Sequence, residues 1–371
     1  MKITGIDTWL VAIPLRGAFR NAHAVKSVQR SVIVRVSADE GLVGAGNVDP
    51  SPGYSEATAE AIQAVIREQL EPALKGQDPF NVRSALLRMD AVAPGAFYAQ
   101  AAVEMALIDL SGKALGVPAH RLLGGPVRET IRLNGWIGIE DPETAAATAR
   151  EFWRRGYRST KVKVGGGVEA DRDRVAAVRA AVPDMEVRVD GNEGYDVEAA
   201  IRLARAIAPY RIALLEQPVP RNDLAGLARV RRAIDIPLMA DEAIEGPETL
   251  LAVIRLEAAD IVKVKVMKQG GLLRCLQALD MAAAAGISCV IGHGFGLALN
   301  TLAELHVAAV GSNVIDGCEC VGPTKLTGDV VGQPVVMETG SVAVPMMPGL
   351  GAELDDRALR HWDVTRVATS P

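Results

Sequence analysis

Seven ionisable side chains recur at nearly even spacing from the middle of the chain onward. Successive members lie 24 to 28 residues apart, and they are Lys163, Asp190, Glu216, Asp241, Lys265, His293 and Glu319. Each one follows or ends a short apolar run of strand-forming residues. A single charge of this kind is most simply explained by a salt bridge or by solvation. Seven in phase predict that successive strands deliver them to one site.

Three consecutive members of this series are acids, which points to a metal ion. Carboxylate oxygens are the ligands that Mg²⁺ prefers, and that ion keeps other positions open for water or substrate. Without a cation, three converging carboxylates would repel one another. We therefore predict that Asp190, Glu216 and Asp241 bind one Mg²⁺, with Mn²⁺ as an alternative ion. Asn192 and Glu242 are expected to support these ligands.

Lysines flank the three acids on both sides. The stretch "STKVKVGGG" (159–167) places Lys161 and Lys163 two residues apart between valines, so both point to the same face of a strand. Lys265 approaches from the other side. A lysine pKa of about 10.4 is too high for a base at neutral pH, but a second ammonium group and a divalent cation lower it. We expect Lys163 and Lys265 to act as acid and base, and Lys161 to lower the pKa of Lys163.

This combination is suited to removing a proton α to a carboxylate. The product of that step is an enediolate, whose negative charge a divalent cation stabilises. Ammonium groups on both sides of the substrate allow a proton to leave from one face and to return on the other. The sequence therefore predicts an enzyme that acts on a small carboxylic acid.

The elements that must position these residues alternate between strand and helix. Strand-like runs are expected at 132–139, 158–164, 186–192, 213–218, 237–242, 259–266, 288–294 and 314–321. Amphipathic helical stretches separate them, including those at 169–182, 196–208, 247–256 and 271–286. Eight such units over about 200 residues predict a closed parallel (β/α)₈ barrel, whose active sites lie at the carboxyl ends of the strands.

The residues before and after the barrel have a different pattern. Residues 1–125 contain a predicted hairpin that turns at residues 39–41, followed by helical stretches at 55–74 and 98–116. We interpret them as an α+β domain that precedes a barrel of residues 126–325. The tail, residues 326–371, is expected to return to the first domain.

Composition excludes several other classes of protein. Hydrophobic residues make up 49% of the 371 residues, which is enough for a large core, and the net charge of −5 is mild. Neither a nucleic-acid surface nor a membrane segment is indicated. The four cysteines lie in apolar surroundings in the last third of the chain, where a disulfide framework is not expected. With no signal peptide, the protein is predicted to be cytoplasmic.

The sequence resembles the enolase superfamily, specifically the muconate lactonizing enzyme subgroup of the mandelate racemase/muconate lactonizing enzyme family. The resemblance spans essentially the whole chain and rests on "AAVEMALIDLSGKALGVPAHRLLGG", "KVKVGGG", "RVDGN", "LLEQPV", "MADEA", "KVKVMKQGG" and "GPTKL". It implies a (β/α)₇β barrel with a capping domain formed by both ends of the chain. By position it also implies the same metal ligands and the same two acid–base lysines. Assembly as a homo-oligomer, from dimer to octamer, is expected.

Departures from the family pattern concern the substrate. Mandelate racemases carry an Asp where Lys265 stands, yet "GHGFG" places His293 where those enzymes have their catalytic His. His293 could therefore protonate a leaving group or serve only as a hydrogen-bonding loop residue. Dipeptide epimerases carry an Asp-x-Asp pair at the eighth strand. Asp316 and Glu319 are the candidates here for binding the substrate, at a different spacing.

Loops of the cap are expected to close over the mouth of the barrel. They are residues 15–26 and 48–57, and the candidate substrate contacts on them are Arg20, His23 and Tyr54. The favoured function is a Mg²⁺-dependent racemase, epimerase or cycloisomerase of a small carboxylate. A dehydratase that eliminates water after the same deprotonation is the alternative. A non-catalytic binding protein on the same scaffold is disfavoured, because the metal and lysine positions are intact.

Overall fold

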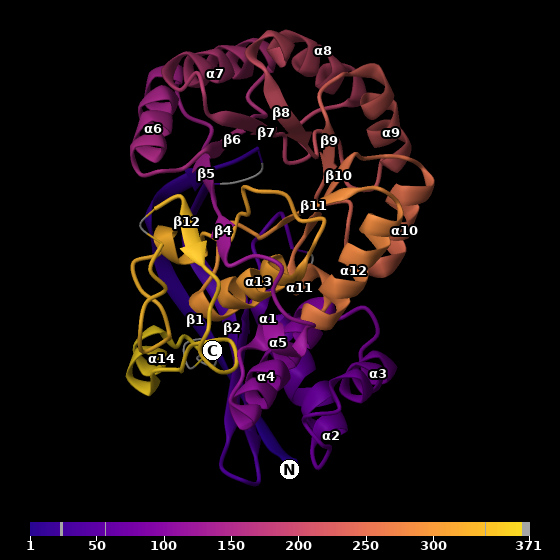
Figure 1. The fold of residues 1–371 in the computed structure, drawn as a ribbon, viewed down its shortest axis with the longest axis vertical. Helices are drawn as coiled ribbons and strands as arrows, with labels where there is room; N and C mark the ends of the chain where they lie inside the picture. The colour runs from indigo at the N-terminus through magenta and orange to yellow at the C-terminus, as the bar shows by residue number, and fades with distance from the viewer. Residues whose placement is uncertain (23–24, 56, 338, 366–371) are drawn as a thin grey trace, which may run out of the picture.

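The computed structural model describes residues 1–22, 25–55, 57–337 and 339–365. The chain forms two parts, a cap at the bottom of Figure 1 and a barrel at its top, and the C-terminal segment runs back along the cap. His23, one of the predicted substrate contacts, lies outside the described residues.

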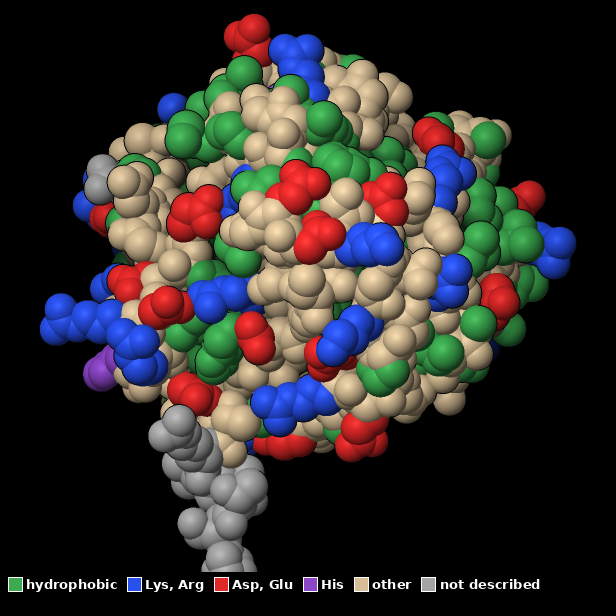
Figure 2. Space-filling view, turned by 90° about the horizontal axis from the view of Figure 1, so that it is seen from below, with side chains coloured by type: hydrophobic (Ala, Val, Ile, Leu, Met, Phe, Trp, Pro, Cys, Tyr) green, Lys and Arg blue, Asp and Glu red, His purple; other side chains and the backbone are tan. Residues whose placement is uncertain are grey.

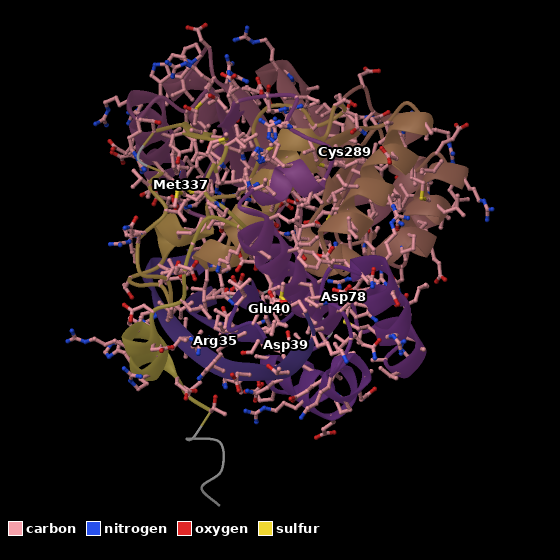
Figure 3. All side chains as sticks on the ribbon, turned by 60° about the horizontal axis from the view of Figure 1, so that its bottom comes forward. Arg35, Asp39, Glu40, Asp78, Cys289 and Met337 are labelled. Carbon is pink, nitrogen blue, oxygen red and sulfur yellow. The ribbon has the colours of Figure 1, made fainter. Side chains whose placement is uncertain are left out.

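The cap begins with an antiparallel sheet in the order β1–β2–β3. Its strands are β1 (Ile3–Arg20), β2 (Val25–Ala38) and β3 (Val43–Val48). The predicted hairpin is confirmed, because the Gly41 N–H donates to the Ala38 carbonyl at 3.1 Å between β2 and β3. Figure 3 labels Asp39 and Glu40 at this turn, close to Arg35 of β2.

Helices cover one side of this sheet. They are α1 (Ala59–Val65), the π-helical turn η1 (Ile66–Leu70), α2 (Glu71–Leu74), α3 (Val82–Val92), α4 (Phe97–Leu115) and α5 (Ala119–Leu122). Helix α4 is buried along most of its length because it lies between β3 and the barrel helix α11. A Cβ at Gly44 would lie 2.0 Å from the Ala106 carbonyl oxygen, so this close approach of strand and helix requires glycine.

The barrel contains seven parallel strands in the order β11–β10–β9–β8–β7–β6–β5. They are β5 (Asn134–Ile137), β6 (Ser159–Lys163), β7 (Glu186–Asp190), β8 (Ile212–Glu216), β9 (Leu238–Ala240), β10 (Ile261–Val264) and β11 (Ser288–Ile291). Strands β4 (Thr130–Arg132) and β12 (Ser341–Ala343) form a separate antiparallel pair, and this pairing was not predicted.

The eighth predicted strand, 314–321, is not a continuous strand. It closes the barrel through two isolated parallel bridges, Cys289 with Val314 on one side and Leu133 with Cys318 on the other. Gly317 between them has a φ of +81°, and a Cβ there would lie 2.5 Å from the Arg188 guanidinium. A left-handed residue breaks the pleat, so the ladder is interrupted where Arg188 fills the interior.

Helices connect the strands on the outside of the barrel (Figure 1). They are α6 (Pro142–Arg154), α7 (Val168–Ala181), α8 (Val197–Ile207) with η2 (Ala208–Tyr210), α9 (Leu224–Ala233), α10 (Gly246–Arg255), α11 (Val266–Gln269), α12 (Leu272–Ala284), α13 (Ala298–Val310) and η3 (Gly322–Lys325). Asp141, Asp196 and Asp223 cap three of them by accepting a backbone N–H three residues on, which explains where α6, α8 and α9 begin.

The interior of the barrel is mostly apolar at its floor, where the buried Arg188 lies beside Leu214, and it is charged at its mouth. Leu214, Met239 and Val290 form a small buried cluster, with Ile261 and Ile315 packed against it. Figure 3 labels Cys289, which is one of four buried free cysteines. The apolar floor supports the polar layers above it, as expected for a barrel of this type.

The C-terminal segment returns to the cap, as predicted. Helix α14 (Asp356–Trp362) packs on β1, and the Val364 N–H donates to the Leu10 carbonyl at 2.8 Å. On the face seen in Figure 2, basic and acidic side chains are interspersed, and neither sign gathers into one patch. Within the described ranges, no helix combines the length and apolar character needed to cross a bilayer.

Candidate active site

A cavity of about 300 Å³ lies between the cap and the mouth of the barrel. The barrel contributes Lys161, Lys163, Asp190, Asp241, Lys265, His293 and Glu319, and the cap contributes Lys26 and Tyr54. Glu216 is fully buried in the carboxylate cluster at the barrel mouth. The strand ends therefore bring together the seven residues that the spacing predicted.

One half of the site is organised around Lys161. Its Nζ lies 2.9 Å from carboxylate oxygens of both Asp190 and Glu216, and 2.7 Å from Glu319. Lys163 lies at the end of the same strand and contacts Asp190 at 2.6 Å. The prediction that Lys161 and Lys163 both face inward is confirmed, since strand β6 places residues two apart on one side.

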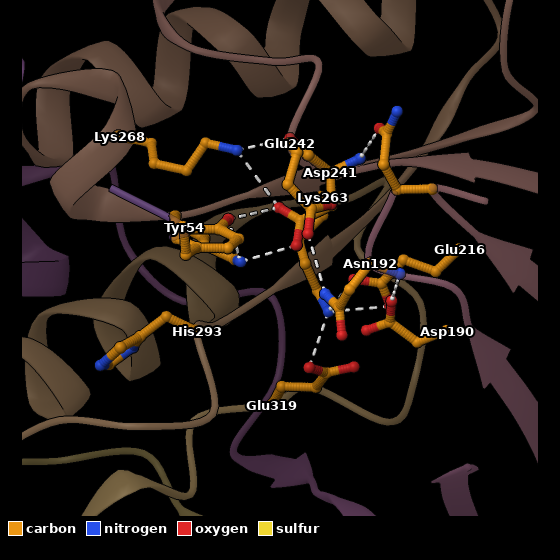
Figure 4. Close-up of polar contacts among 12 residues, drawn as sticks. Tyr54, Asp190, Asn192, Glu216, Asp241, Glu242, Lys263, Lys268, His293 and Glu319 are labelled. Atoms are coloured by element: carbon orange, nitrogen blue, oxygen red, sulfur yellow. Dashed lines mark hydrogen bonds and ion pairs between the residues drawn. The ribbon is translucent and has the colours of Figure 1, made fainter. Parts of the chain in front are cut away.

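The other half of the site is organised around Asp241, immediately after β9. Lys265 contacts this carboxylate at 2.8 Å, and Lys268 contacts it at 3.2 Å. From the cap, the Tyr54 hydroxyl donates to Asp241 at 2.8 Å and also hydrogen-bonds Lys265. Figure 4 shows Tyr54 beside Asp241, so the cap reaches directly into the cluster.

Several residues of the site were not predicted from the sequence. Lys263 is fully buried and joins Glu216 at 3.0 Å to Glu319 at 2.7 Å. Lys268 and Gln217 were also missed. The signal for Lys263 was present in "VKVKV", because a residue two before Lys265 must share its inward face. Nothing in the sequence marked Lys268, which reaches Asp241 from helix α11.

Two non-glycine residues at the strand ends adopt left-handed backbone conformations. Asn192 has a φ of 40° and Gln217 a φ of 30°. The Asn192 side chain accepts from Lys163 at 2.5 Å and donates to Glu242 at 2.8 Å, which confirms its predicted proximity to the site. Gln217 accepts the Asp241 N–H at 3.0 Å. Such conformations cost energy and tend to occur where a side chain must be aimed at a site.

In the first half of the site, the surroundings shift the pKa values of Asp190 and Glu216 in opposite directions. Burial alone would raise the pKa of Asp190, but Lys161 and Lys163 outweigh it and lower that pKa to about 2. Burial and the charge of Asp190 raise the pKa of Glu216 to about 7, despite Lys161 and Lys263. A buried carboxylate with this pKa would gain from an additional cation beside it.

Two lysines of the site, Lys161 and Lys265, have raised pKa values. Burial lowers the pKa of Lys265, but Asp241 more than offsets this and raises it. The pKa of Lys161 likewise lies well above its usual value, because Asp190 and Glu216 outweigh burial. Burial and the Asp241 charge raise the pKa of Glu242 to about 8. Burial lowers the pKa values of Lys263 and Lys268, so the lysines of the site are shifted in both directions. The effect of Lys161 on Lys163 stays a prediction.

The acids fit a divalent cation by their chemistry, although they are not assembled around one. In the part of the chain that the structure describes, no three His, Cys, Asp or Glu side chains are arranged to hold an ion as they stand. Ammonium groups stand between the carboxylates instead, as Lys161 does between Asp190 and Glu216. The donors are all buried oxygens, and one Glu242 oxygen has no hydrogen-bond partner. This set suits a hard cation once an ammonium group withdraws.

His293 reaches the cavity wall but is engaged elsewhere. Its Nδ1 lies 2.9 Å from Glu304, and its Nε2 lies 3.1 Å from Asn300 and 3.5 Å from Asp49. In Figure 4 no dashed line joins His293 to the other residues drawn. This geometry favours the hydrogen-bonding interpretation of His293, and a role in protonating a leaving group stays a prediction.

The structure does not bring Arg20 or Asp316 into the cavity. Arg20 has an exposed side chain, and its backbone carbonyl accepts the Ile139 N–H at 3.0 Å. Asp316 is exposed and faces Arg132 at 3.6 Å. Asp316 points outward and Glu319 points inward, with the left-handed Gly317 between them. Glu319 itself is held by two lysines, which leaves little reason for it to bind a substrate ammonium group.

A capped barrel with acids and lysines at its strand ends defines the enolase class of enzymes. Residues 4–124 match the mandelate racemase/muconate lactonizing enzyme N-terminal domain, and residues 144–358 match the enolase C-terminal domain-like family. The chain belongs to the mandelate racemase/muconate lactonizing enzyme family of the enolase superfamily.

Individual relatives narrow the class further. The N-succinyl-L-Arg/Lys racemase of Bacillus cereus is 33% identical over 366 residues, 98% of each chain. Its crystal structure has a TM-score of 0.94 at 32% identity, over 98% of both chains. Muconate cycloisomerase 1 of Pseudomonas putida is 33% identical over 353 residues, 94% of each chain.

A third relative was solved with ligands. The dipeptide epimerase of Enterococcus faecalis, complexed with Mg and L-Leu-L-Tyr, has a TM-score of 0.90 at 31% identity. The match covers 95% of this chain and 100% of that one. A racemase, a cycloisomerase and an epimerase are all isomerases. The chain is therefore an enolase-superfamily isomerase, and the dehydratase alternative is not favoured.

Proposed function

We propose that this enzyme catalyses a proton transfer at the carbon α to a carboxylate, with Lys163 and Lys265 as the two acid–base groups. The observation that carries this proposal is their placement. Strands β6 and β10 are separated by β7, β8 and β9 in a barrel that the segment 314–321 closes, so they lie across the barrel from each other. Both lysines line the same cavity.

This arrangement supports racemisation or epimerisation. A substrate held between the two lysines presents one face of its α-carbon to each. One neutral amine removes the proton, and the opposite ammonium group donates a proton to the other face. Lys163 and Lys265 each form an ion pair with one acid. Lys161 pairs with three buried acids and Lys263 with two, so these two lysines are less free to exchange protons and instead stabilise negative charge.

We propose Mg²⁺ as the cofactor, held by Asp190, Glu216 and Asp241. Bound there, the ion would stabilise the negative charge that develops on the substrate carboxylate. Support comes from the all-oxygen donor set and from the Mg in the related dipeptide epimerase structure. Lys161 would have to leave the position between Asp190 and Glu216, and Glu319 remains as its partner at 2.7 Å.

For the substrate we propose an N-acylated amino acid, a dipeptide or a muconate-like acid, which are the compounds named for the relatives. Incubation of each candidate in D₂O with Mg²⁺ tests the proposal. Deuterium at the α-carbon together with loss of optical activity would show racemisation or epimerisation. A lactone would show cycloisomerisation. If no acid of these classes exchanges its α-proton or rearranges, the proposal is wrong.

A further inference from the structure

One lysine of the cavity has no role in the proposed chemistry. Lys325 lies in η3 after the barrel, with 8% of its surface exposed. Its Nζ lies 4.0 Å from the ring centroid of Phe295, 4.4 Å from that of Trp136 and 5.1 Å from that of Phe19. No hydrogen bond or ion pair joins Lys325 to another residue in the described ranges.

A second lysine lies on the same aromatic ring. Lys26 of β2 in the cap approaches the Phe295 ring to 4.7 Å. Its Nζ donates to Gln29 and Ser51, both at 2.5 Å, which are neutral acceptors. Among the described residues, Lys26 has no carboxylate within ion-pair distance. One end of the cavity, which we call the distal end and define by Lys26, Phe295 and Lys325, thus carries two lysines that form no ion pair with a described residue.

Two carboxylates act on these lysines without forming an ion pair with them, Asp49 on Lys26 and Glu319 on Lys325. Glu319 is already shared by Lys161 and Lys263, each at 2.7 Å. Asp49 accepts from Ser31 and Asn47, and it also faces His293. The cavity and the buried groups around it hold seven lysines against six carboxylates: Lys26, Lys161, Lys163, Lys263, Lys265, Lys268 and Lys325 against Asp49, Asp190, Glu216, Asp241, Glu242 and Glu319.

A buried ammonium group without an anion is costly, and burial shifts its pKa toward the neutral form. Three aromatic faces compensate part of that cost for Lys325 through cation–π attraction. Burial nonetheless lowers the pKa of Lys26 to about 8 and that of Lys325 well below its usual value. An anion bound beside them would favour the charged form of both lysines.

From this geometry we propose that the distal end binds a second carboxylate of the substrate, so that the substrate is a dicarboxylic acid. The proposal rests on the proposed function, in which the first carboxylate lies near Asp190 and Asp241. Lys26 and Lys325, both close to the Phe295 ring, supply the positive charge that the carboxylate needs. The described residues of the distal end include no arginine, and no helix of eight or more residues begins among them. The distal end is therefore less suited to a doubly charged phosphate than to a carboxylate.

A measurement of ligand binding tests the distal carboxylate site independently of catalysis. N-succinylglycine is a dicarboxylate without a stereocentre, and its terminal amide, N-succinamoylglycine, has the same shape with one charge fewer. Calorimetry in Mg²⁺ buffer should show that the wild-type protein prefers the dicarboxylate by about 10- to 100-fold, as a charge-assisted hydrogen bond would give. No preference for the dicarboxylate would overturn the proposal.

Variants assign the preference to the distal end. Lys325→Met keeps an unbranched chain among the rings and should reduce the preference to within about 3-fold, while binding of the amide stays unchanged. Lys325→Arg should retain the preference. Lys75→Met, at an exposed lysine of the cap, is the matched control and should behave as wild type. Equal loss of both ligands in Lys325→Met would indicate a structural role and overturn the assignment.

Turnover measurements then test the distal site and the proposed function together, and their outcomes distinguish a failure of one from a failure of the other. If N-succinyl amino acids exchange their α-proton, Lys325→Met should lower kcat/KM for them about 10- to 100-fold and leave their terminal amides unaffected. If the wild-type protein prefers the dicarboxylate but exchanges no α-proton, the proposed function fails and the distal site stands. If exchange occurs without the binding preference, the distal site fails alone.

Discussion

At the scale of single residues, Lys163 and Lys265 occupy matching but unequal surroundings. Lys163 contacts Asp190 and Asn192, whereas Lys265 contacts Asp241 and lies 4.2 Å from the centre of the Tyr54 ring. Each is tied to one acid of the cluster. Each can therefore address only the face of a substrate that is turned toward its own strand.

Alanine substitutions of Lys163 and Lys265 should show that each lysine acts on one face of the substrate. In a racemase, Lys163→Ala should stop α-deuterium exchange for one enantiomer and Lys265→Ala for the other, each by about 10²- to 10⁴-fold, while racemisation fails in both. Proton NMR of each enantiomer in D₂O measures the exchange. Lys75→Ala serves as the control for loss of an exposed lysine. Full activity after either change at the site would refute the assignment of these lysines.

Glu216 offers a test of the metal that does not depend on turnover. Wild-type protein should show a rise in melting temperature when Mg²⁺ is added, because the ion binds only the folded state. Glu216→Gln should lose most of that rise and all activity. The variant also removes a charge that Lys161 and Lys263 contact, so its melting temperature without Mg²⁺ must be recorded as the reference. An undiminished Mg²⁺ effect would exclude Glu216 as a ligand.

The residues that sequence could predict are those fixed by the period of the barrel. The seven in-phase positions follow from strand after strand ending at the same level, and the structure places all seven at the mouth or directly beneath it. Lys268 and Lys325 could not be found in this way. They enter from short helical turns, where neither a period of two nor the repeat of about 26 residues applies.

At the scale of elements, His293 joins two parts of the fold. It follows β11 and connects Glu304 of α13 to Asp49, which comes directly after β3 of the cap. Helix α13 carries both Glu304 and Asn300, so the network ties one barrel helix to the cap sheet. This linkage explains a buried histidine without invoking proton transfer.

Substitution of His293 by glutamine distinguishes the two interpretations. If His293 is a linker, His293→Gln should lower stability by about 1–3 kcal/mol and leave turnover within about 10-fold of wild type. Glu304→Gln, which alters the partner and leaves the histidine, should reproduce the stability loss. If His293 instead protonates a leaving group, turnover should collapse with little change in the unfolding midpoint. Urea unfolding and steady-state kinetics on the same samples provide the comparison.

A stacked pair of buried histidines predicts sensitivity to acid. His306 of α13 stacks on His120 with ring centroids 5.3 Å apart, and its Nε2 faces the Leu350 carbonyl at 3.2 Å. Burial lowers the pKa of His306 to about 4. The folded state then binds fewer protons than the unfolded state between about pH 6.5 and 4, so stability is lost as the pH falls through this window.

The size of this effect is measurable. At pH 5.5 the loss from His306 should be about 1 kcal/mol relative to pH 8. In His306→Gln the amide can accept from the His120 N–H and donate to the Leu350 carbonyl, as the neutral ring does, but it does not titrate. The difference in unfolding free energy between this variant and wild type should therefore move in favour of the variant as the pH falls. A constant difference would contradict the assignment.

The order of the elements was predictable, but the interruption of the eighth strand was not. Alternating apolar runs and amphipathic stretches predict seven strands that the structure confirms, with boundaries that differ by a few residues. The segment 314–321 has the same composition, but the left-handed Gly317 next to Arg188 interrupts its pairing. Contact with a side chain from a distant strand has no signature in a local pattern. For the same reason the pairing of β4 with β12, more than 200 residues apart, could not be anticipated.

At the scale of the whole molecule, the cap and barrel share a charged contact at a helix end. Glu104 of the buried cap helix α4 accepts the Leu272 N–H at 2.8 Å and the Leu273 N–H at 2.9 Å, where the barrel helix α12 begins. Gly271 precedes them with a φ of +130°, and a Cβ there would lie 2.6 Å from the Glu104 carboxyl carbon. The carboxylate thus replaces the ordinary side-chain cap of α12.

This contact should make the cohesion of the two parts depend on pH. Burial raises the pKa of Glu104 to about 7, although the two N–H groups and Arg274 oppose the rise. The folded state therefore binds more protons than the unfolded state between about pH 4.5 and 7. Stability is lost as the pH rises through this window, by about 2 kcal/mol between pH 5.5 and 8.

Substitution of Glu104 by glutamine isolates the contribution of its ionisation to the free energy of unfolding. Glu104→Gln keeps one oxygen to accept an N–H of α12 but cannot ionise, so it should be less stable than or equal to wild type at pH 5.5. Relative to wild type it should gain about 2 kcal/mol between pH 5.5 and 8. Urea unfolding at the two pH values measures the change. Glu68→Gln removes the same charge from an exposed position of the cap and is the matched control. If Glu104→Gln follows the control at both pH values, the ionisation of Glu104 does not contribute to how the cap is held on the barrel.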